Sequence, residues 1–255
     1  MQVLIDAGLI LLGYILGSIP SGLLWVRWIS GKDIRDVASG RTGGTNAARA
    51  AGPAAGILTA ISDGAKAAVA AWIAMAVSPS HNWIHVLAPL AAILGHNYSL
   101  FLIERGPGNR LRFRGGAGGG PTVGGAIGLW WPSALIVLPI AALVFFGIGY
   151  ASVTTISIAL TITAIFAVGY YLHMPWAQLP DLIYGMIALA LLLWALRPNI
   201  KALVEGRERF HGWRPWRGTK PLFPLHAGTT KKSDAPTDTG LKSKEKPDAS
   251  NSARS

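Results

Sequence analysis

Long apolar runs alternate with short polar and glycine-rich segments along the chain. In the first half, the apolar runs cover Val3–Trp28, Ala54–Val77 and Ile84–Ile103. Each run is close to the roughly 20 residues that an α-helix needs to cross the hydrocarbon core of a bilayer. We therefore predict an all-α fold, a polytopic bundle of membrane-spanning helices.

The second half is predicted to add four shorter spans, because turn-forming residues divide its apolar sequence. Basic residues precede Gly115 and follow Leu196. Since basic loops gather on the cytoplasmic side of a membrane, an even number of crossings must lie between them. The total becomes seven helices, with two longer spans in this half as the alternative. The four predicted spans are Pro121–Trp131, Ala134–Gly149, Val153–Tyr170 and Asp181–Leu196.

Polar residues and a proline interrupt the first three spans. Pro20 lies within the first span, where it predicts either a break in the helix or a simple kink. Asp63 and Lys66 share one face of the second span, which predicts an ion pair that orients the helix, with direct ligand contact as the alternative. His96, in the third span, is predicted to pack or to form a hydrogen bond. No carboxylate accompanies it at ligand spacing, so we expect no metal site.

Two glycine-rich segments flanked by arginines are the strongest candidates for a functional site. The first runs from Ser39 to Arg49 and the second from Gly115 to Gly120. Glycine lets a ligand approach backbone N–H groups, and the N–H groups at a helix start favour an anion. With Asn46 as the cap of a short helix, Arg49 would follow on the same face. Both segments are predicted on the cytoplasmic side, where they would form a phosphate site. The alternatives are a flexible basic loop for the first segment and tight helix packing for the second.

The composition agrees with a membrane protein and excludes several other classes. Of the 255 residues, 51% are hydrophobic and 14% are charged, well below the roughly 25% charged residues of soluble domains. The net charge is +11, but the basic residues crowd the loops and the C-terminal tail. This pattern predicts a membrane rather than nucleic acid as the partner. The absence of cysteine excludes disulfides and thiolate catalysis.

The last part of the chain differs in composition from the rest. Residues 211–255 contain many lysines, serines, prolines and threonines and few apolar residues. Such a segment cannot bury enough apolar surface to fold, so it is predicted to be a disordered basic cytoplasmic tail. The membrane domain is predicted to cover residues 1–210.

A series of short motifs resembles the bacterial acyl-phosphate:glycerol-3-phosphate acyltransferases in order and spacing, over about residues 3–210. The motif of the first glycine segment is the most specific of the series. The motifs are Ser18-Ile19-Pro20, Asp33-Ile34-Arg35, Ser39-Gly40, Gly43-Gly44-Thr45-Asn46 with Arg49, Asp63 with Lys66, Gly95-His96-Asn97, Gly115-Gly116-Ala117-Gly118, Tyr150-Ala151-Ser152 and Asn199…Gly206…Glu208.

The resemblance implies a seven-helix enzyme of the bacterial inner membrane, with its N-terminus outside and its motifs cytoplasmic. Such an enzyme moves a fatty acyl group from acyl phosphate to the 1-hydroxyl of glycerol 3-phosphate, giving lysophosphatidic acid. No cofactor is expected, and the acyl chain would lie among the helices and membrane lipids. The residues implied for catalysis are Ser39, Arg49, Ser152 and Asn199. Those implied for binding phosphate and substrate are Gly43, Gly44, Thr45, Asn46, Gly115, Gly116 and Gly118.

Three positions depart from the family pattern. Ala117 stands where Gly-Gly-Lys-Gly is usual, Leu196 stands where a histidine is usual, and Arg41 stands where an asparagine usually follows Ser-Gly. Arg41, Arg112 and Arg114 are candidates to supply the charge of the missing lysine. A non-catalytic relative that binds lipid phosphates is therefore one alternative, and an anion transporter is another.

Overall fold

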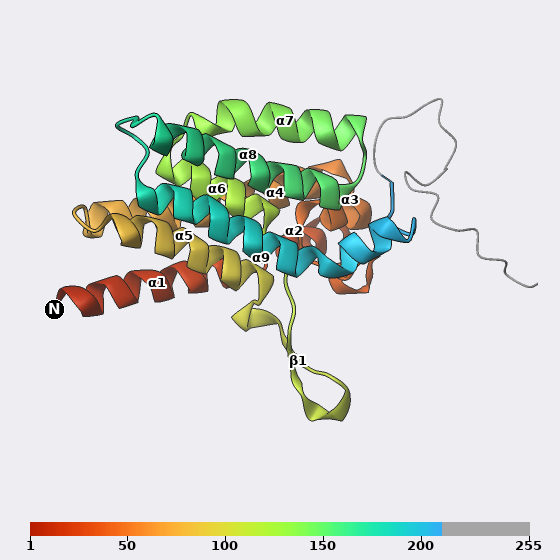
Figure 1. Ribbon diagram of the computed structural model, residues 1–255. Helices are drawn as coiled ribbons and strands as arrows, with labels where there is room; N and C mark the ends of the chain where they lie inside the picture. The colour runs from red at the N-terminus through yellow and green to blue at the C-terminus, as the bar shows by residue number, and fades with distance from the viewer. Residues whose placement is uncertain (211–255) are drawn as a thin grey trace, which may run out of the picture.

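The computed structural model describes residues 1–210 as a bundle of long helices that lie roughly parallel (Figure 1). Five stretches are long and apolar enough to cross a membrane by length and composition. Their ranges are Gln2–Ser30, Pro53–Val77, Asn82–Leu102, Ala151–Tyr171 and Leu179–Val204. The predicted tail, residues 211–255, lies outside the described residues.

The first apolar run is broken rather than merely kinked. Helix α1 (Gln2–Ser18) ends and α2 (Ser21–Ser30) begins on either side of Ile19 and Pro20. Proline lacks the N–H that would continue the helix, and a broken span leaves carbonyl groups that need other donors. The carbonyl of Ile19 accepts a hydrogen bond from Lys66 Nζ at 3.0 Å. The alternative of a simple kink is therefore wrong.

Of the next helices, α4 (Pro53–Val77) follows its predicted apolar run closely, whereas α5 (Asn82–Asn97) ends six residues before the predicted end at Ile103. Helix α3 (Gly44–Ala51) is short and precedes both. A short hairpin of β1 (Ile103–Arg105) and β2 (Leu111–Phe113) then projects from the bundle (Figure 1). Helical periodicity along the chain did not predict this hairpin. Its strands pair antiparallel, with Glu104 opposite Arg112.

Four separate helices occupy the second half, and two of them are long and apolar enough to cross a membrane. Four spans and the alternative of two longer spans are therefore both still predictions. The four helices are α6 (Gly119–Leu129), α7 (Ser133–Gly147), α8 (Ala151–Tyr171) and α9 (Leu179–Val204). The 11 residues of α6 would measure about 16 Å at 1.5 Å per residue, about half of a bilayer core. The count of seven crossings stays a prediction. The last span was predicted to end at Leu196, but helix α9 continues beyond it through Pro198.

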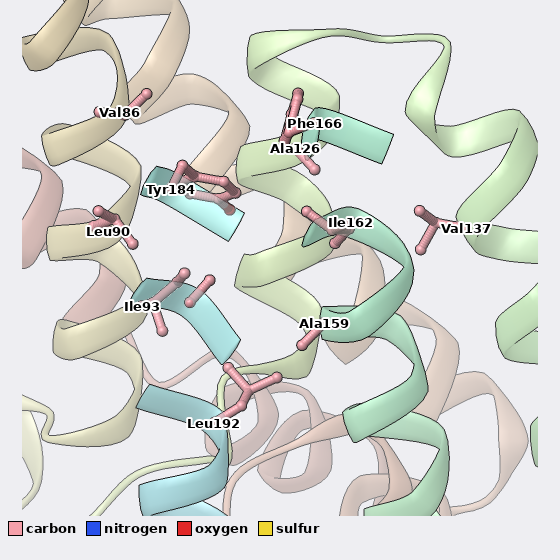
Figure 2. Close-up of a cluster of buried hydrophobic side chains, with 11 residues drawn as sticks. Val86, Leu90, Ile93, Ala126, Val137, Ala159, Ile162, Phe166, Tyr184 and Leu192 are labelled. Atoms are coloured by element: carbon pink, nitrogen blue, oxygen red, sulfur yellow. The ribbon is translucent and has the colours of Figure 1, made fainter. Parts of the chain in front are cut away.

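The largest buried cluster of the described residues joins α5, α6, α7, α8 and α9 (Figure 2). Its largest members, Phe166 and Tyr184, are fully buried, with their rings edge to face at 6.1 Å between centroids. Tyr184 donates its hydroxyl hydrogen to the carbonyl of Thr122 at 2.8 Å, which satisfies the polar end of this buried ring. The cluster fixes α6, and therefore its first residues, relative to α5 and α9.

Helix α6 also lies against α4 at very short range. A Cβ on Gly124 would be 1.8 Å from the carbonyl oxygen of Gly64, so only glycine allows this approach. Small residues are typical of close helix pairs in membranes, where backbone contact replaces the hydrophobic effect. This contact places the start of α6 beside the middle of α4.

Candidate functional site

The starts of α3 and α6 meet the same turn of α4. A Cβ on Gly44 would lie 3.4 Å from Ala60 Cβ, and a Cβ on Gly120 would lie 3.6 Å from Ala60 O. Ala60 nevertheless remains exposed between them. The two glycine-rich segments, far apart in sequence, are therefore brought together at one end of the bundle, as predicted for a shared site.

Both helix starts present backbone N–H groups that have no acceptor among residues 1–210. In the first segment these are the N–H groups of Gly43, Gly44 and Thr45, and in the second those of Ala117, Gly118, Gly119 and Gly120. Unpaired N–H groups carry the positive end of the helix dipole and attract anions. This geometry favours the binding of two anionic groups side by side.

Asn46 has a different place from the one predicted. Gly43, not Asn46, is the N-cap of α3, and Asn46 lies buried inside the first turn. Its Nδ2 group contacts three carbonyl oxygens of the preceding loop, those of Ile34 at 3.1 Å, Val37 at 3.0 Å and Arg41 at 2.8 Å. The amide therefore holds the loop in shape, and Thr45 and Arg49, four residues apart, share the outer face of the helix.

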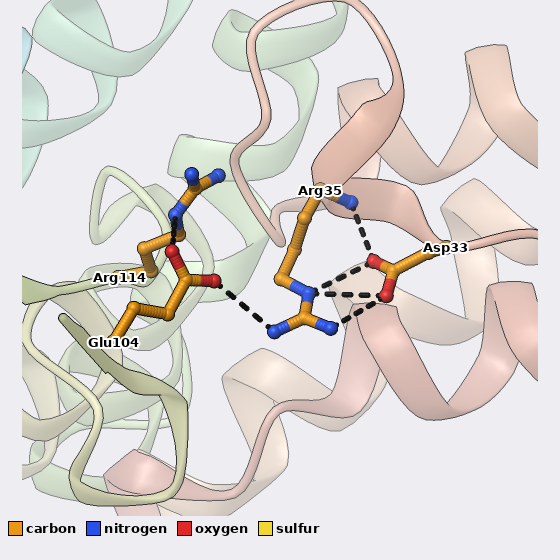
Figure 3. Close-up of polar contacts among 4 residues, drawn as sticks. All are labelled: Asp33, Arg35, Glu104 and Arg114. Atoms are coloured by element: carbon orange, nitrogen blue, oxygen red, sulfur yellow. Dashed lines mark hydrogen bonds and ion pairs between the residues drawn. The ribbon is translucent and has the colours of Figure 1, made fainter. Parts of the chain in front are cut away.

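Ion pairs tie the first loop to the hairpin that precedes the second segment (Figure 3). Arg35 binds Asp33 at 2.6 Å and Glu104 at 3.1 Å, and Glu104 also binds Arg114 at 2.6 Å. The hydrogen bond from the Arg35 side chain lowers the pKa of Asp33 to about 2, against the opposing effect of partial burial. Arg35 and Arg114 are thus committed to carboxylates.

The second glycine segment packs directly on the end of α5. A Cβ on Gly115 would lie 2.2 Å from the carbonyl oxygen of His96, and one on Gly116 would lie 1.9 Å from His96 Nε2. The N–H of Gly116 donates to the same carbonyl at 2.9 Å. Gly115 accepts a hydrogen bond from Thr42 of the first loop at 3.3 Å. These two glycines are required for close packing, whereas Gly118, with φ of +88°, directs the chain into α6.

The predicted pair of Asp63 and Lys66 forms, and His96 joins it. Lys66 Nζ lies 2.9 Å from Asp63 Oδ1, 3.0 Å from His96 Nδ1 and 3.0 Å from Ile19 O. All three side chains are buried. The ammonium group has three N–H donors, and three acceptors surround it. The cluster connects the break in the first helix to the histidine under Gly116, which supports the prediction of an orienting pair.

Ser152 lies at the start of α8, where it binds Glu208. Its backbone N–H donates to Glu208 Oε1 at 3.1 Å, and its hydroxyl donates to Oε2. The same carboxylate acts on Arg49: partial burial and the neighbouring Arg209 lower the pKa of the Arg49 guanidinium, whereas Glu208 raises it. Ser152 and Arg49 therefore lie at the same end of the bundle, next to the last described residues. Glu208 was missing from the predicted site residues, although it belongs to the last motif of the series.

Arg41 of the first loop contacts α9 one turn before Asn199. Arg41 Nη2 donates to the carbonyl of Ala195 at 2.6 Å, and Asn199 follows Ala195 by one turn. Asn199 is half-buried, and its side chain has no hydrogen-bond partner among residues 1–210. Ser39 is exposed at the rim and accepts a weak hydrogen bond from Arg41 N at 3.4 Å. All the predicted site residues thus belong to segments that meet at one end of the bundle.

The described residues contain no group of three or more His, Asp or Glu side chains that could hold a metal ion. The chemistry available at this end of the bundle is that of N–H donors, guanidinium groups and amides. It is suited to holding phosphate groups and to neutralising their charge.

Fold and site together define an integral membrane protein with arginines and unpaired backbone N–H groups gathered at one end of its helices. A sequence model of the family described as glycerol-3-phosphate acyltransferase matches residues 7–206. The chain belongs to this family.

Relatives and solved structures agree with this membership. The glycerol-3-phosphate acyltransferase of Rubrobacter xylanophilus is 34% identical over 84% of this chain and 100% of its own. That of an Anaeromyxobacter species is 36% identical over 79% of this chain and 95% of its own. The crystal structure of PlsY, an integral membrane glycerol 3-phosphate acyltransferase, in its glycerol 3-phosphate form has a TM-score of 0.70 at 28% identity. It covers 81% of this chain and 96% of that protein. The lysophosphatidic acid form gives a TM-score of 0.68 at 26% identity, over 80% and 94% of the two chains.

Proposed function

We propose that this protein transfers a fatty acyl group from acyl phosphate to the 1-hydroxyl of glycerol 3-phosphate. The products are lysophosphatidic acid and inorganic phosphate, the first step of phospholipid synthesis. Family membership supports the acyl transfer and the glycerol 3-phosphate. The observation that carries the two-phosphate mechanism is the meeting of two helix starts at Ala60, each with N–H groups that have no acceptor.

The chemistry needs positioning and charge neutralisation more than a dedicated base. Acyl phosphate is an activated mixed anhydride, so the hydroxyl oxygen of glycerol 3-phosphate attacks its carbonyl carbon directly. A new C–O ester bond forms, the C–O bond to phosphate breaks, and phosphate leaves. The hydroxyl proton passes to a phosphate oxygen of the substrates. Holding both reactants together supplies most of the rate, and the surrounding cations stabilise the leaving dianion.

The two segments divide the substrates between them. The start of α3, with Arg49 on the same face as Thr45, is assigned to glycerol 3-phosphate, and the start of α6 is assigned to acyl phosphate. Asn46 shapes the first loop, and Gly115 and Gly116 hold the second segment on α5. The groups proposed to contact glycerol 3-phosphate or the released phosphate are those of Ser39, Gly43, Gly44, Thr45, Arg49, Ser152 and Asn199. The N–H group of Gly118 is proposed to contact acyl phosphate.

A cavity of about 640 Å³ between α2 and α4 is the proposed place of the acyl chain. Leu24, Trp25 and Trp28 line it, and its polar end is Lys66, which contacts the same His96 that underlies Gly116. Ala65 also lines the cavity, so Ala65→Phe should raise the KM for palmitoyl phosphate more than that for octanoyl phosphate. The exposed Ala76, near the other end of α4, provides the matched control Ala76→Phe. Equal effects of the two variants on both donors would exclude this cavity.

The proposed location is the bacterial inner membrane, with the glycine segments and the C-terminal tail on the cytoplasmic side. The crowding of arginines at that end supports it. Because the chain has no cysteine, single cysteines report the orientation directly. In intact cells, a cysteine at Arg112 or Arg207 should resist an impermeant thiol reagent, and a cysteine at Ser80 should react. Labelling at Arg112 or Arg207 from outside would reverse the orientation.

The decisive experiment uses the purified full-length protein with palmitoyl phosphate and labelled glycerol 3-phosphate, scored for lysophosphatidic acid. We expect turnover with acyl phosphate and none with palmitoyl-CoA at equal concentration. Phosphate binding without turnover would instead identify a non-catalytic lipid-phosphate-binding relative, consistent with Ala117 and Leu196. Uptake of glycerol 3-phosphate into proteoliposomes without acylation would identify a transporter.

A further inference from the structure

Arg41 is a partly buried cation that has no ion-pair partner in the described part of the chain. Its Nη2 group donates to Ala195 O, a neutral carbonyl, at 2.6 Å. Its Nη1 group is inaccessible to solvent and has no hydrogen-bond partner. Among residues 1–210 no carboxylate forms an ion pair with Arg41. Burial lowers the pKa of this guanidinium, yet the group stays charged, because an arginine does not lose its proton in a protein.

A partly buried charge of this kind is costly unless something pairs with it. The cost indicates that a part of the site is absent from the protein chain itself. A bound anion would supply the missing partner and would at the same time satisfy Nη1.

Contacts around Arg41 place its guanidinium between α9 and the second glycine segment. Ala195 lies one turn beyond Leu192, whose Cδ1 would be 3.0 Å from a Cβ on Gly118. The residue after Arg41, Thr42, donates its N–H to Gly115 O at 3.3 Å. The nearby N–H groups from Ala117 to Gly120 also have no acceptor among residues 1–210. A cation and a row of donors thus converge beside the start of α6.

The other basic groups next to the second segment are already paired. Lys66 binds Asp63 at 2.9 Å, and Arg114 binds Glu104 at 2.6 Å. Arg112 lies on the exposed strand β2 of the hairpin, away from α9. Of the three arginines that are candidates for the charge of the missing lysine, Arg41 has the geometry to act at the start of α6.

We propose that Arg41 binds the phosphate of acyl phosphate and replaces, from the first segment, the lysine usual at the position of Ala117. This inference rests on the proposed function. The carbonyl of Ala195 orients the planar fork, so that Nη1 is directed at the phosphate. A lysine at position 41 would keep the charge but could not hold both partners with one planar group.

The test compares Arg41→Asn, Arg41→Lys and the double variant Arg41→Asn with Ala117→Lys. Arg110→Ala, at an exposed position of the hairpin, serves as the control. We expect Arg41→Asn to raise the KM for palmitoyl phosphate roughly ten- to a hundredfold, because one charge-assisted contact is lost. The KM for glycerol 3-phosphate should stay within about twofold of the parent value. Arg41→Lys should recover only part of the loss, and Ala117→Lys should restore much of it. Arg110→Ala should leave both constants unchanged.

Two results would overturn the inference. One is an unchanged KM for palmitoyl phosphate in Arg41→Asn, and the other is an increase confined to glycerol 3-phosphate. A second measurement is independent of turnover. Palmitoyl phosphate should raise the unfolding temperature of the parent protein. The concentration that gives half of this increase should be at least about tenfold higher for Arg41→Asn. If the parent does not turn over but shows this difference, the proposed function fails and the role of Arg41 in phosphate binding stands. Equal stabilisation of parent and variant rejects that role whatever the activity.

Discussion

The two glycine-rich segments use glycine for different physical reasons. In the first segment, Gly43 has open space around it: a Cβ there would meet nothing within 4 Å. In the second, a Cβ on Gly115 would overlap the carbonyl oxygens of His96 and Asn97, at 2.2 Å and 2.5 Å. The first segment is shaped by side chains, chiefly the buried amide of Asn46. The second is shaped by backbone packing and has no polar side chain of its own.

This difference explains why the two segments depend on one another. The second segment offers N–H groups without a cation, and the first supplies Arg41, which reaches α9 beside it. The ion pairs of Arg35 and Arg114 with Glu104 hold the two loops together at the rim (Figure 3). The proposed site for two phosphates thus combines one segment that is shaped by packing with another that is shaped by hydrogen bonds.

The largest effect is expected from Gly115→Ala, paired with Gly43→Ala. The methyl group at position 115 has no room unless the segment moves off α5, so we expect a loss of about 3 kcal/mol in stability and of most acylation. The same methyl group at position 43 should change stability by less than about 0.5 kcal/mol. Thermal unfolding in detergent and the acylation assay measure both. Similar stability of the two variants would show that the segments do not differ in this way.

The next effect concerns Arg49, on the outer face of α3. Arg49→Ala should raise the KM for glycerol 3-phosphate roughly ten- to a hundredfold, or about 1.5–3 kcal/mol, because a charge-assisted contact to phosphate is lost. Arg49→Lys should raise it less, since the charge remains but the planar fork does not. Unchanged KM and kcat in Arg49→Ala would require the phosphate site to be placed elsewhere.

Asn46→Ala separates the shaping of the loop from the binding of substrate. It leaves three loop carbonyls without the amide that contacts them. We expect a loss of about 1–2 kcal/mol in stability and a milder change in the KM for glycerol 3-phosphate than in Arg49→Ala. Arg49→Ala should leave the unfolding temperature nearly unchanged. If Asn46→Ala raised the KM for glycerol 3-phosphate more than Arg49→Ala does, Asn46 would have to contact the substrate directly.

The smallest effect is expected from the ion pairs at the rim, and it depends on pH. The folded-state pKa of Asp33 is lowered to about 2 by its hydrogen bond with Arg35. A carboxylate with a depressed pKa contributes stability above its unfolded value of 3.8, and this contribution is lost as the pH falls toward 2. The pair is partly exposed, so we expect about 1 kcal/mol or less. Asp33→Asn should therefore be less stable than the parent at pH 6 and equally stable near pH 2. If the difference in stability between Asp33→Asn and the parent persisted at pH 2, it would come from something other than the charge of Asp33.

The apolar runs alone determined most of the helices, because burial in lipid needs only length and hydrophobicity. The break at Pro20, the pair of Asp63 and Lys66, and the two glycine segments were also readable, since proline geometry, helical spacing and glycine content are local properties. The end of α9 was not: the last span was predicted to end at Leu196, but the helix continues through Pro198. The carbonyl of Trp194 accepts a hydrogen bond from Arg197 Nε at 3.1 Å. The hairpin after α5 left no periodic pattern long enough to detect.

The tertiary structure alone decided which polar groups meet. Arg41 and Ala195 are 154 positions apart, Ser152 and Glu208 are 56 apart, and Lys66 and His96 are 30 apart. Periodicity describes which face a residue occupies within one helix, but not which helix lies opposite. That choice depends on backbone approaches such as Gly124 on Gly64 and Gly115 on His96. The sequence therefore contained the candidate site residues as separate motifs, and helix packing brought these motifs to one end of the bundle, with Arg41 in contact with α9.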